Sequence, residues 1–398
     1  MIDVEASLAA FARGAVDLID DKDLRKKLER GQPLRVKFGM DPSSPDLHVG
    51  HSIPLLKLRD LQQLGHTIVL IVGDATAMVG DPTGRNTLRP QLTRGQVEEN
   101  LRTYVEQASL VLDMQRTEVR RNSEWFDSLD FGGILKLLGR TTVARMLERD
   151  TFANRMQAGE PIGMHELLYP ILQGWDSVEI KADVELGGTD QLFNLLFGRT
   201  LQEQESQARQ VCITTPLING TDGRKMSKSY NNSIALTDAP NDMFGKVMSI
   251  TDDVMELWYV QLTRLAPERI AELLGGHPRE AKATLAAELV RNYHGDQAAG
   301  DARAAFDKQF VKKELPDDIP DVAVDTDWSA AGLPLTVLLR EAGLAQSGSE
   351  ARRLIEQGGV KLAGEVVKDP KHLVPPPAES LLVQVGKRRF ANVRAGAR

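Results

Sequence analysis

The sequence contains very little cysteine and no long apolar segment. Cys212 is the only cysteine among 398 residues, which excludes an internal disulfide framework and a cysteine-rich zinc site. No run of eighteen apolar residues occurs, so no transmembrane helix is expected. The first residues, "MIDVEASLAAFARGAVDLIDDKD", have scattered acidic residues instead of a basic start and an apolar core, so they do not resemble a signal peptide. We therefore expect a cytoplasmic protein.

The charge is distributed unevenly along the chain. A composition of 41% hydrophobic and 26% charged residues is typical of a soluble globular protein, and the length predicts two or three domains. Residues 331–398 hold 11 Lys/Arg and 6 Asp/Glu, a net charge of +5, whereas the remainder has a net charge of −12. A basic segment on an acidic body favours a polyanionic partner, although chance variation of surface charge explains it equally well.

The first two hundred residues alternate strand and helix patterns. Residues 34–40 read as a buried strand, 52–65 as a helix that stops at Gly65, and 66–77 as a second strand, which together make a βαβ unit. Further strands are predicted at 181–186 and 208–218, with a helix between them from about Asp190. Residues 95–160 read as mainly helical, with one strand near "TEVRRNS". These patterns predict an α/β fold with a Rossmann-like parallel sheet.

The rest of the chain divides into segments of different character. We predict a Rossmann-like domain over 1–220, with a helical insertion near 110–160, and a polar loop followed by an α-helical domain over 221–315. Residues 316–333 are acidic, contain proline and lack periodicity, which indicates a linker. Residues 334–398 predict a small α+β domain of two short helices and a strand–turn–strand ending.

Two histidines stand three residues apart in "HVGH", where the first strand leads into the helix. Side chains at i and i+3 share one helix face, and a helix N-terminus attracts anions, so His48 and His51 are suited to bind phosphate. Gly50 between them allows a flat base to approach the backbone. A zinc site would need further ligands, and the nearby Asp41 and Asp46 are not at a recognised spacing. "HVGH" alone is equally compatible with two surface histidines.

A second polar stretch, "KMSKS", follows about 175 residues later. Lys225 and Lys228 flank Met226, and lysine is a flexible point charge that suits phosphates whose charge moves during a reaction. Taken alone, such a lysine pair is more often an ordinary solvated loop. The two stretches, in this order, resemble the "HIGH" and "KMSKS" signatures of class I aminoacyl-tRNA synthetases.

Further segments resemble one branch of that class. "GDPTGR" (80–85), "YPILQGWDS" (169–177) and "ELGGTDQLFN" (185–194) resemble the pocket segments of the bacterial tyrosyl-tRNA synthetase family, in its KMSKS-bearing subgroup. The C-terminal segment resembles an S4 RNA-binding domain. The resemblance covers nearly the whole chain. It implies that L-tyrosine and ATP form tyrosyl-adenylate and pyrophosphate, and that the tyrosyl group then passes to the 3′ end of tRNA(Tyr). It also implies a homodimer with the 110–160 region as a candidate interface, and Mg²⁺ that arrives with ATP and is not tightly bound by the protein.

The resemblance implies roles for individual residues. Catalytic residues would be His48, His51, Lys225, Lys228 and Ser229. Residues at ATP or the adenylate would be Asp41, Gly50, Arg85, Gly188, Asp190, Gln191 and Met226, with help from Arg89. Residues at tyrosine would be Lys37, Gly39, Asp81, Tyr169, Gln173 and Asp176. The last three lie at i, i+4 and i+7 on one predicted helix face, which suits a polar ligand or, alternatively, solvent. Asp176 would accept a hydrogen bond from the substrate phenol.

Position 37 departs from the family pattern. Many members carry a tyrosine there that helps to bind the phenol, whereas this chain has Lys37. A lysine at this place either contacts the substrate region, turns away from it, or pairs with a carboxylate. The sequence leaves these alternatives open.

The S4-like segment carries the predicted RNA contacts. Arg340, Arg352, Arg353, Lys361 and Lys371 would form a basic face for the RNA backbone, and a solvated charged face is the alternative.

Three other functions compete with the main hypothesis. A tryptophanyl-tRNA synthetase is disfavoured by the S4-like tail and Asp176, and a nucleotidyltransferase for a small metabolite by the tail and the length. A non-catalytic RNA-binding relative is disfavoured by the intact "HVGH" and "KMSKS".

Overall fold

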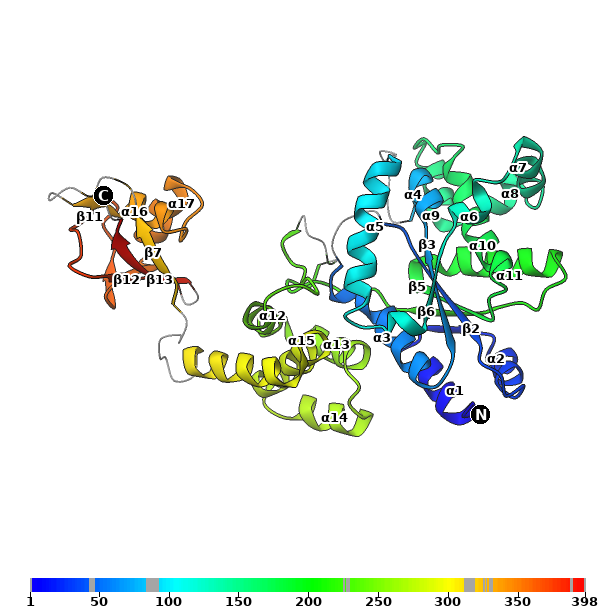
Figure 1. The fold of residues 1–398 in the computed structure, drawn as a ribbon, viewed down its shortest axis with the longest axis horizontal. Helices are drawn as coiled ribbons and strands as arrows, with labels where there is room; N and C mark the ends of the chain where they lie inside the picture. The colour runs from blue at the N-terminus through cyan, green and yellow to red at the C-terminus, as the bar shows by residue number, and fades with distance from the viewer. Residues whose placement is uncertain are drawn as a thin grey trace. The chain divides into compact units, whose positions relative to one another are not determined.

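The computed structural model describes residues 2–42, 47–83, 93–224, 226, 230–310, 319–324, 326, 328, 332–386 and 389–396. The chain forms two compact units, Met1–Arg303 and Ala304–Arg398. The first unit contains both the parallel sheet and the helical region that follows it (Figure 1). The boundary predicted near residue 220 is therefore not a division between compact units.

The first unit is built on a six-stranded sheet with the order β1-β6-β5-β2-β3-β4. Five strands run parallel, and β1 at one edge pairs antiparallel with β6. The strand bounds are β1 Asp17–Ile19, β2 Arg35–Met40, β3 Thr67–Val72, β4 Thr117–Arg121, β5 Val184–Gly188 and β6 Val211–Thr215. This arrangement confirms the predicted Rossmann-like α/β fold.

The order of the strands fixes where the helices lie. Helix α3 (Val49–Gln63) connects β2 to β3, and α11 (Leu192–Gln204) connects β5 to β6 in the opposite direction across the sheet. Because parallel crossovers are right-handed, these two helices cover opposite faces (Figure 1). The chain therefore reverses its direction of winding between β2 and β5, and the carboxyl ends of these strands open on a crevice where α/β sheets bind ligands.

The remaining helices of the first unit surround this framework. They are α1 Val4–Ala12, α2 Asp21–Leu28, α4 Asp74–Val79, α5 Arg94–Ala108, α6 Ser123–Phe126, α7 Phe131–Leu138, α8 Val143–Met146, α9 Asp150–Gln157, α10 Tyr169–Glu179, α12 Pro240–Val247, α13 Met255–Leu262, α14 Pro267–Gly275 and α15 Pro278–Phe310. Helix α15 is kinked at Gly295, and its residues after Arg303 belong to the second unit. None of the helices in the described ranges is long and apolar enough to cross a membrane. The strand predicted over 66–77 ends at Val72, because Gly73 precedes the first turn of α4.

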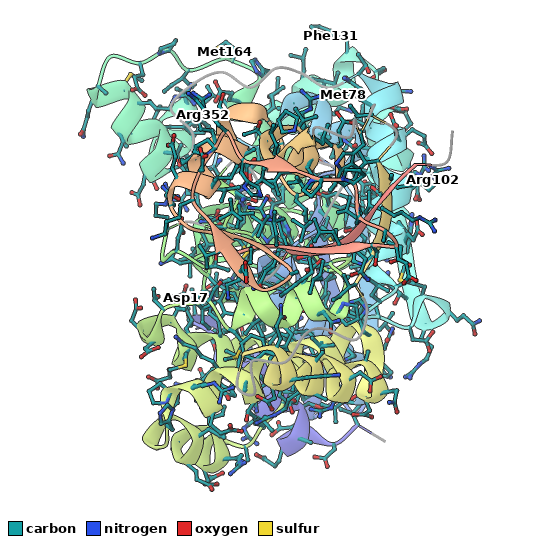
Figure 2. All side chains as sticks on the ribbon, turned by 90° about the vertical axis from the view of Figure 1, so that its left-hand side faces the viewer. Asp17, Met78, Arg102, Phe131, Met164 and Arg352 are labelled. Atoms are coloured by element: carbon teal, nitrogen blue, oxygen red, sulfur yellow. The ribbon has the colours of Figure 1, made fainter. Side chains whose placement is uncertain are left out.

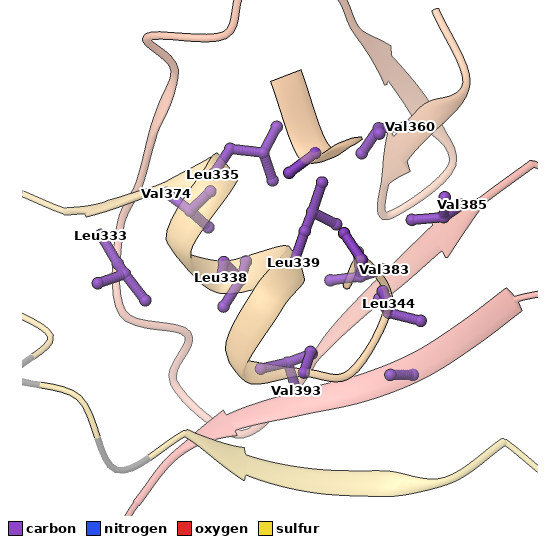
Figure 3. Close-up of a cluster of buried hydrophobic side chains, with 14 of the residues drawn as sticks. Leu333, Leu335, Leu338, Leu339, Leu344, Val360, Val374, Val383, Val385 and Val393 are labelled. Atoms are coloured by element: carbon purple, nitrogen blue, oxygen red, sulfur yellow. The ribbon is translucent and has the colours of Figure 1, made fainter. Parts of the chain in front are cut away.

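The second unit is a small α+β fold. Its main sheet has the order β10-β9-β12-β13-β7, with bounds β7 Asp321–Val324, β9 Val360–Leu362, β10 Glu365–Val367, β12 Leu381–Val385 and β13 Arg389–Ala395. Strands β8 (Leu333–Pro334) and β11 (Leu373–Val374) form a separate pair. Helices α16 (Leu335–Glu341) and α17 (Gly348–Glu356) pack on one face of the main sheet, and Leu338, Leu339 and Val383 lie in the shared core (Figure 3).

The linker predicted over 316–333 needs a correction. Residues Asp321–Val324 form strand β7, which pairs parallel with β13 at the edge of the second unit's sheet. Val324 is buried and Val322 packs against the core, whereas Asp321 and Ala323 are exposed. This alternation is that of a strand, but four residues between acidic and proline-bearing neighbours are too short for the period to be recognised.

Candidate functional site

A cavity of about 290 Å³ opens at the crevice between β2 and β5. Its floor is formed by the carboxyl ends of these strands, and its walls by the start of α3, the end of β3 and one face of α10. Eleven of the predicted site residues line it: Gly39, Asp41, Gly50, His51, Asp81, Tyr169, Gln173, Asp176, Gly188, Asp190 and Gln191. Residues that are far apart in the sequence thus converge on one place.

The other predicted residues do not line this cavity or cannot be placed. Lys225, Lys228, Ser229, Arg85 and Arg89 lie outside the described residues. Met226 is buried, and it does not line the cavity. His48 and Lys37 stand behind cavity-lining residues, in two different ways that are described below.

The two histidines form the N-terminal cap of α3. The His48 Nδ1 accepts a hydrogen bond from the Gly50 N–H at 3.2 Å, and the His51 Nδ1 accepts one from the His48 N–H at 3.2 Å. A neutral imidazole whose Nδ1 is an acceptor carries its proton on Nε2. The two rings lie 3.8 Å apart between centroids. A Cβ at Gly50 would lie 3.0 Å from the His48 ring, so a larger residue would displace that ring.

The segments that flank the "KMSKS" loop lie against this histidine turn. The Val49 N–H donates to the Ile234 carbonyl at 2.9 Å, and the Leu236 N–H donates to the Leu47 carbonyl at 3.1 Å. Before the loop, Asp222 accepts hydrogen bonds from Arg224 and from the Asn232 side chain, and these contacts lower the pKa of its carboxyl group to about 2. The base of the loop is therefore anchored beside the start of α3.

Asp41 is held by two hydroxyl donors at the end of β2. The Tyr169 Oη donates to one carboxylate oxygen at 2.8 Å, and the Thr76 Oγ1 donates to the other at 2.8 Å. Gly73 makes room for this arrangement, because a Cβ there would lie 2.0 Å from the Asp41 carboxylate. Burial and the nearby Asp41 raise the pKa of the Tyr169 phenol, so Tyr169 remains a hydroxyl donor at neutral pH.

Asp81 lies at another corner of the cavity and collects several donors. It accepts from the Thr83 backbone N–H at 2.9 Å and from the Gln191 Nε2 at 2.7 Å. The guanidinium of Arg149, which is almost fully buried, lies 3.4 Å from Asp81 and also donates to the Thr83 hydroxyl. Arg149 stacks on Phe152, with its guanidinium carbon 5.4 Å from the ring centroid. The carboxylate is thus fixed in position and its charge is partly balanced.

A chain of amide groups links this corner to the middle of α10. The Asn194 Nδ2 donates to the Gln191 Oε1 at 2.9 Å and to the Gln173 Oε1 at 2.8 Å. The Gln173 Nε2 points to Glu185 on β5 at 3.3 Å. The orientation of the Gln173 side chain is therefore determined from both of its ends.

Asp176 lies at the buried end of the cavity, 4% exposed. It accepts a hydrogen bond from the Trp125 Nε1 at 3.0 Å and a longer one from the Asn122 Nδ2 at 3.5 Å. Burial raises the pKa of the Asp176 carboxyl to about 7, and the positive charge of Lys37 opposes this rise. Asp176 is therefore a cavity group whose charge changes near neutral pH.

Lys37 occupies a different place from the one predicted for it. Its side chain is fully buried, with Nζ 2.9 Å from the Glu185 carboxylate and 2.7 Å from both the Ser177 Oγ and the Gln173 backbone carbonyl. It does not line the cavity. The prediction that Lys37 contacts the substrate is corrected accordingly, and the alternative of pairing with a carboxylate is confirmed. The cause is the register of the sheet, which places Lys37 directly opposite Glu185.

Several residues of the site were not found from the sequence. They are Gly73, Thr76, Asn122, Trp125, Arg149, Glu185 and Asn194. Gly73 and Asn122 each follow directly on a parallel strand, at the edge of the sheet where ligands bind, and this position was an available signal. Arg149 and Trp125 carry no such signal, because only the tertiary packing brings them to the cavity.

The predicted RNA-binding residues lie in the second unit. Arg340, Arg352, Arg353 and Lys371 are exposed, and Lys361 is half-buried (Figure 2 shows Arg352). Val360 faces the core, and successive strand residues alternate in direction, so Lys361 points away from the face that α16 and α17 cover. Arg340 thus lies on α16, Arg352 and Arg353 lie on α17, Lys361 lies on the opposite side of the sheet, and Lys371 lies between β10 and β11. The single basic face predicted for them stays a prediction.

No cluster of three or more His, Cys, Asp or Glu side chains with the geometry to hold a metal ion occurs among the described residues. The cavity presents hydroxyl, amide, imidazole and carboxylate groups at the carboxyl edge of a parallel sheet. Such a set can bind a small zwitterion and can donate hydrogen bonds to phosphate oxygens at the start of α3.

Comparison with known proteins gives two family matches. The family described as "tRNA synthetases class I (W and Y)" matches residues 29–311, and the S4 domain matches residues 333–379. A protein named tyrosine–tRNA ligase from Bordetella pertussis is 50% identical over 404 residues, covering 98% of this chain and 97% of that protein. The tyrosine–tRNA ligase of Thermotoga maritima is 48% identical and covers 98% of each chain.

A solved structure is also similar to this chain. It is the C-terminally truncated mitochondrial tyrosyl-tRNA synthetase of Aspergillus nidulans, with a TM-score of 0.65 and 26% sequence identity. The match covers 76% of this chain and 94% of that one.

Proposed function

The chain belongs to the class I tRNA synthetases of the tryptophan and tyrosine group and carries an S4 domain, and on this premise we propose that it is a tyrosine–tRNA ligase. It would activate L-tyrosine with ATP to tyrosyl-adenylate and pyrophosphate, and then transfer the tyrosyl group to the 3′ end of tRNA(Tyr). The observation that carries the proposal is the single cavity that joins a buried carboxylate, Asp176, to the histidine turn at the start of α3. Relatives of about 50% identity with this activity support it.

The cavity suits tyrosine at one end and phosphates at the other. Asp81 and the oxygen of the Gln173 side chain would accept hydrogen bonds from the substrate ammonium, and Tyr169 would complete this subsite together with Asp41. Asp176 would accept a hydrogen bond from the phenol. The tyrosine carboxylate would then lie where it can attack the α-phosphate of ATP, and positioning of this kind supplies much of the rate of a group transfer.

The phosphate end would stabilise the charge that develops as pyrophosphate leaves. His51 lines the cavity, and His48 holds its ring through stacking and through the backbone hydrogen bond to His51 Nδ1. Lys225, Lys228 and Ser229 would approach from the loop whose base is anchored beside His48, and Arg85 would approach from the loop after Asp81. Mg²⁺ would enter with ATP as part of that substrate. Gly188, Asp190 and Gln191 would contact the adenylate from β5.

The S4 domain would bind tRNA through its exposed cations. The division of these cations between two sides of the sheet favours Arg352 and Arg353 on α17 as one contact region and Lys361 as another. Because phosphate contacts release counterions, this part of the affinity should fall steeply with salt. We propose that the protein acts in the cytoplasm, where bacterial translation takes place.

A charging assay tests the proposal directly. The protein should attach labelled tyrosine, and neither labelled tryptophan nor labelled phenylalanine, to bacterial tRNA in the presence of MgATP. Attachment of tryptophan would instead show that the protein is a tryptophan–tRNA ligase, the other activity of the same family. The absence of any charging would favour a metabolite nucleotidyltransferase or a non-catalytic RNA-binding protein.

The charge of Asp176 gives an expected pH dependence. The pKa of this carboxyl is about 7, so the acceptor carboxylate is present above pH 7 and is lost as the pH falls through that value. We expect kcat/KM for tyrosine to decrease from about pH 8 to about pH 6. Phenylalanine lacks a hydroxyl donor and leaves the ionised carboxylate unmatched, so the ratio of tyrosine to phenylalanine activation should rise about tenfold from about pH 6 to about pH 8.

The matched variant for this measurement is Asp176→Asn. An amide has nearly the same shape and does not titrate, so the ratio of tyrosine to phenylalanine activation should no longer depend on pH. A ratio that still rises with pH in this variant would mean that a group other than Asp176 accepts the hydrogen bond from the phenol.

An exposed apolar surface supports the expected homodimer. Phe131 and Met164 are 75% and 76% exposed, and Leu135, Val143 and Met156 are also more than half exposed. These residues lie on α7, α8, α9 and the segment that precedes α10. Figure 2 shows the Phe131 and Met164 side chains at the outer edge of the molecule. Exposed apolar residues concentrated on one part of a chain mark interaction surfaces, so we propose this region, within the predicted 110–160 range and just beyond it, as the dimer interface.

Charge introduced on this surface should separate the subunits. We expect Phe131→Asp combined with Met164→Asp to give a monomer in sedimentation experiments at micromolar concentration, because two carboxylates would have to be desolvated in the interface. Val16→Asp is the control, since Val16 is 57% exposed and lies before β1, outside this surface. A variant that sediments as the wild-type protein does would show that the subunits associate elsewhere.

A further inference from the structure

A buried polar network lies behind the cavity and includes groups that the proposed reaction does not use. Its centre is the ion pair between Lys37 on β2 and Glu185 on β5, which face each other in the parallel register. Lys37 is 0% exposed and Glu185 is 1% exposed. Two charges without access to solvent are costly unless other groups satisfy them.

The contacts of this pair lead to α10 and to Gln210, which directly precedes β6. Lys37 Nζ donates to the Gln173 backbone carbonyl and to the Ser177 Oγ, both at 2.7 Å. Glu185 accepts from Ser177 at 3.1 Å, from the Gln173 Nε2 at 3.3 Å and from the Gln210 Nε2 at 2.5 Å. The ion pair therefore clamps the turn of α10 that lies between Gln173 and Ser177, and Asp176 belongs to that turn.

The pair also determines which end of the Gln173 amide faces the cavity. An ionised carboxylate can only accept hydrogen bonds, so Glu185 requires the NH₂ end of Gln173 to point toward it. The oxygen of Gln173 is then turned toward Asn194, which donates to it at 2.8 Å, and Gln173 itself lines the cavity. An amide oxygen has two lone pairs, so it can accept a second hydrogen bond from a substrate ammonium. The reversed amide would present a donor to that ammonium instead.

The charge of Lys37 acts on the other end of the substrate site. Burial and the negative charge of Glu185 raise the pKa of the Asp176 carboxyl. The positive charge of Lys37 and the hydrogen bonds from Trp125 and Asn122 lower it. Lys37 is the main cause that lowers the pKa of Asp176, against the rise that burial causes. The Tyr169 phenol also senses Asp176, and it remains protonated at neutral pH.

We propose that Lys37 and Glu185 form a positioning pair that selects tyrosine without touching it. Glu185 fixes the Gln173 amide so that its oxygen faces the substrate ammonium, and Lys37 neutralises Glu185 and favours the charged form of the Asp176 carboxyl that accepts from the substrate phenol. In this chain, the buried ion pair behind the cavity thus takes the place of a direct contact between residue 37 and the substrate. The inference rests on the proposed tyrosine activity and adds to it the way in which tyrosine is chosen.

The test uses ATP–pyrophosphate exchange by the full-length protein and two matched pairs of substitutions. Lys37→Met combined with Glu185→Gln removes both charges of the proposed pair and avoids leaving one of them buried alone. Lys27→Met combined with Asp183→Asn is the control. Lys27 and Asp183 form another lysine–carboxylate pair, with Nζ 3.1 Å from the carboxylate, and Lys27 is also buried, but neither residue lines the cavity.

We expect the Lys37/Glu185 double variant to raise KM for tyrosine by at least about tenfold and to leave KM for ATP within about twofold of the wild-type value. The acid limb of kcat/KM for tyrosine should also move to higher pH, since the loss of Lys37 removes the larger of the two opposing charges on Asp176. The Lys27/Asp183 variant should show neither change. Lys37→Met alone, if it folds, should move the limb further than the double variant.

The results separate this inference from the proposed function. Wild-type protein that shows no tyrosine-dependent exchange would reject the proposed function and this inference with it. Wild-type exchange with an unchanged tyrosine KM in the Lys37/Glu185 variant, or with the same loss in the control pair, would overturn the inference alone. An acid limb of kcat/KM that stays at the wild-type pH in the Lys37/Glu185 variant would also overturn the inference, because a purely structural role of the pair predicts no shift of that limb.

Discussion

His51→Ala is expected to lower the rate of tyrosyl-adenylate formation by about 10² to 10³, with tyrosine affinity close to that of the wild-type protein. His51 lines the cavity at the N-terminal end of α3, and its Nδ1 is engaged by the His48 backbone N–H. The Nε2–H is then the group that can stabilise a phosphate oxygen as pyrophosphate leaves. An interaction that strengthens only in the transition state lowers kcat and leaves binding unchanged when it is removed.

His48→Ala should have a smaller effect in the same direction, because His48 does not line the cavity but stacks on the ring that does. The measurement is single-turnover adenylate formation at saturating ATP, together with an equilibrium titration of tyrosine. A large loss of tyrosine binding with a normal rate at saturation would contradict the role assigned to these histidines.

His277→Ala is the matched control for the loss of a helix cap. His277 precedes α15, and its Nδ1 accepts the Arg279 N–H at 3.2 Å, which is the same contact that His48 makes with Gly50. Each cap contributes about 1 kcal/mol to stability. His277→Ala should therefore reproduce the loss of stability and leave the rate of adenylate formation unchanged.

Ending the chain after Phe310 is expected to reduce kcat/KM for tRNA charging by about 10² to 10³ at physiological salt while pyrophosphate exchange is retained. The cavity lies wholly within Met1–Arg303, so adenylate formation does not require the second unit. The loss should become smaller at low salt, where the remaining phosphate contacts are stronger. Equal loss of charging and exchange would show that the second unit stabilises the first and does not act through RNA.

The structure determines where such a truncation should be made. Strand β7, Asp321–Val324, belongs to the sheet of the second unit, so a cut near residue 331 would leave an unpaired strand attached to the first unit. An unpaired strand edge promotes association between chains. A cut after α15 avoids this, and Arg352→Gln combined with Arg353→Gln in the full-length chain should lower charging in the same direction by a smaller factor.

The sequence was sufficient for the strands and helices that carry the cavity. β3 is a run of β-branched and apolar residues, α3 has apolar residues at helical spacing, and Tyr169, Gln173 and Asp176 lie on one face of α10 as predicted. The eleven residues that line one cavity had been named through the family resemblance, and their roles stay predictions. The strands and helices themselves depend on local periodicity, which a sequence displays directly.

The features that the sequence did not reveal depend on contacts between distant segments. Lys37 meets Glu185 only because β2 and β5 are neighbours in the sheet, and these residues are separated by almost 150 positions in the chain. Trp125 and Asn122 reach Asp176 from the end of β4 for a similar reason. Strand order is not a local property, so these contacts could not be derived before the topology was known.

ATP–pyrophosphate exchange with tyrosine, tryptophan and phenylalanine, each without tRNA, tests the central claim most directly. The claim is that this cavity activates tyrosine and selects it through the Asp176 carboxylate. Exchange with tyrosine alone, at pH 8, is the result expected. Exchange driven by tryptophan, or by phenylalanine as readily as by tyrosine, would contradict the claim.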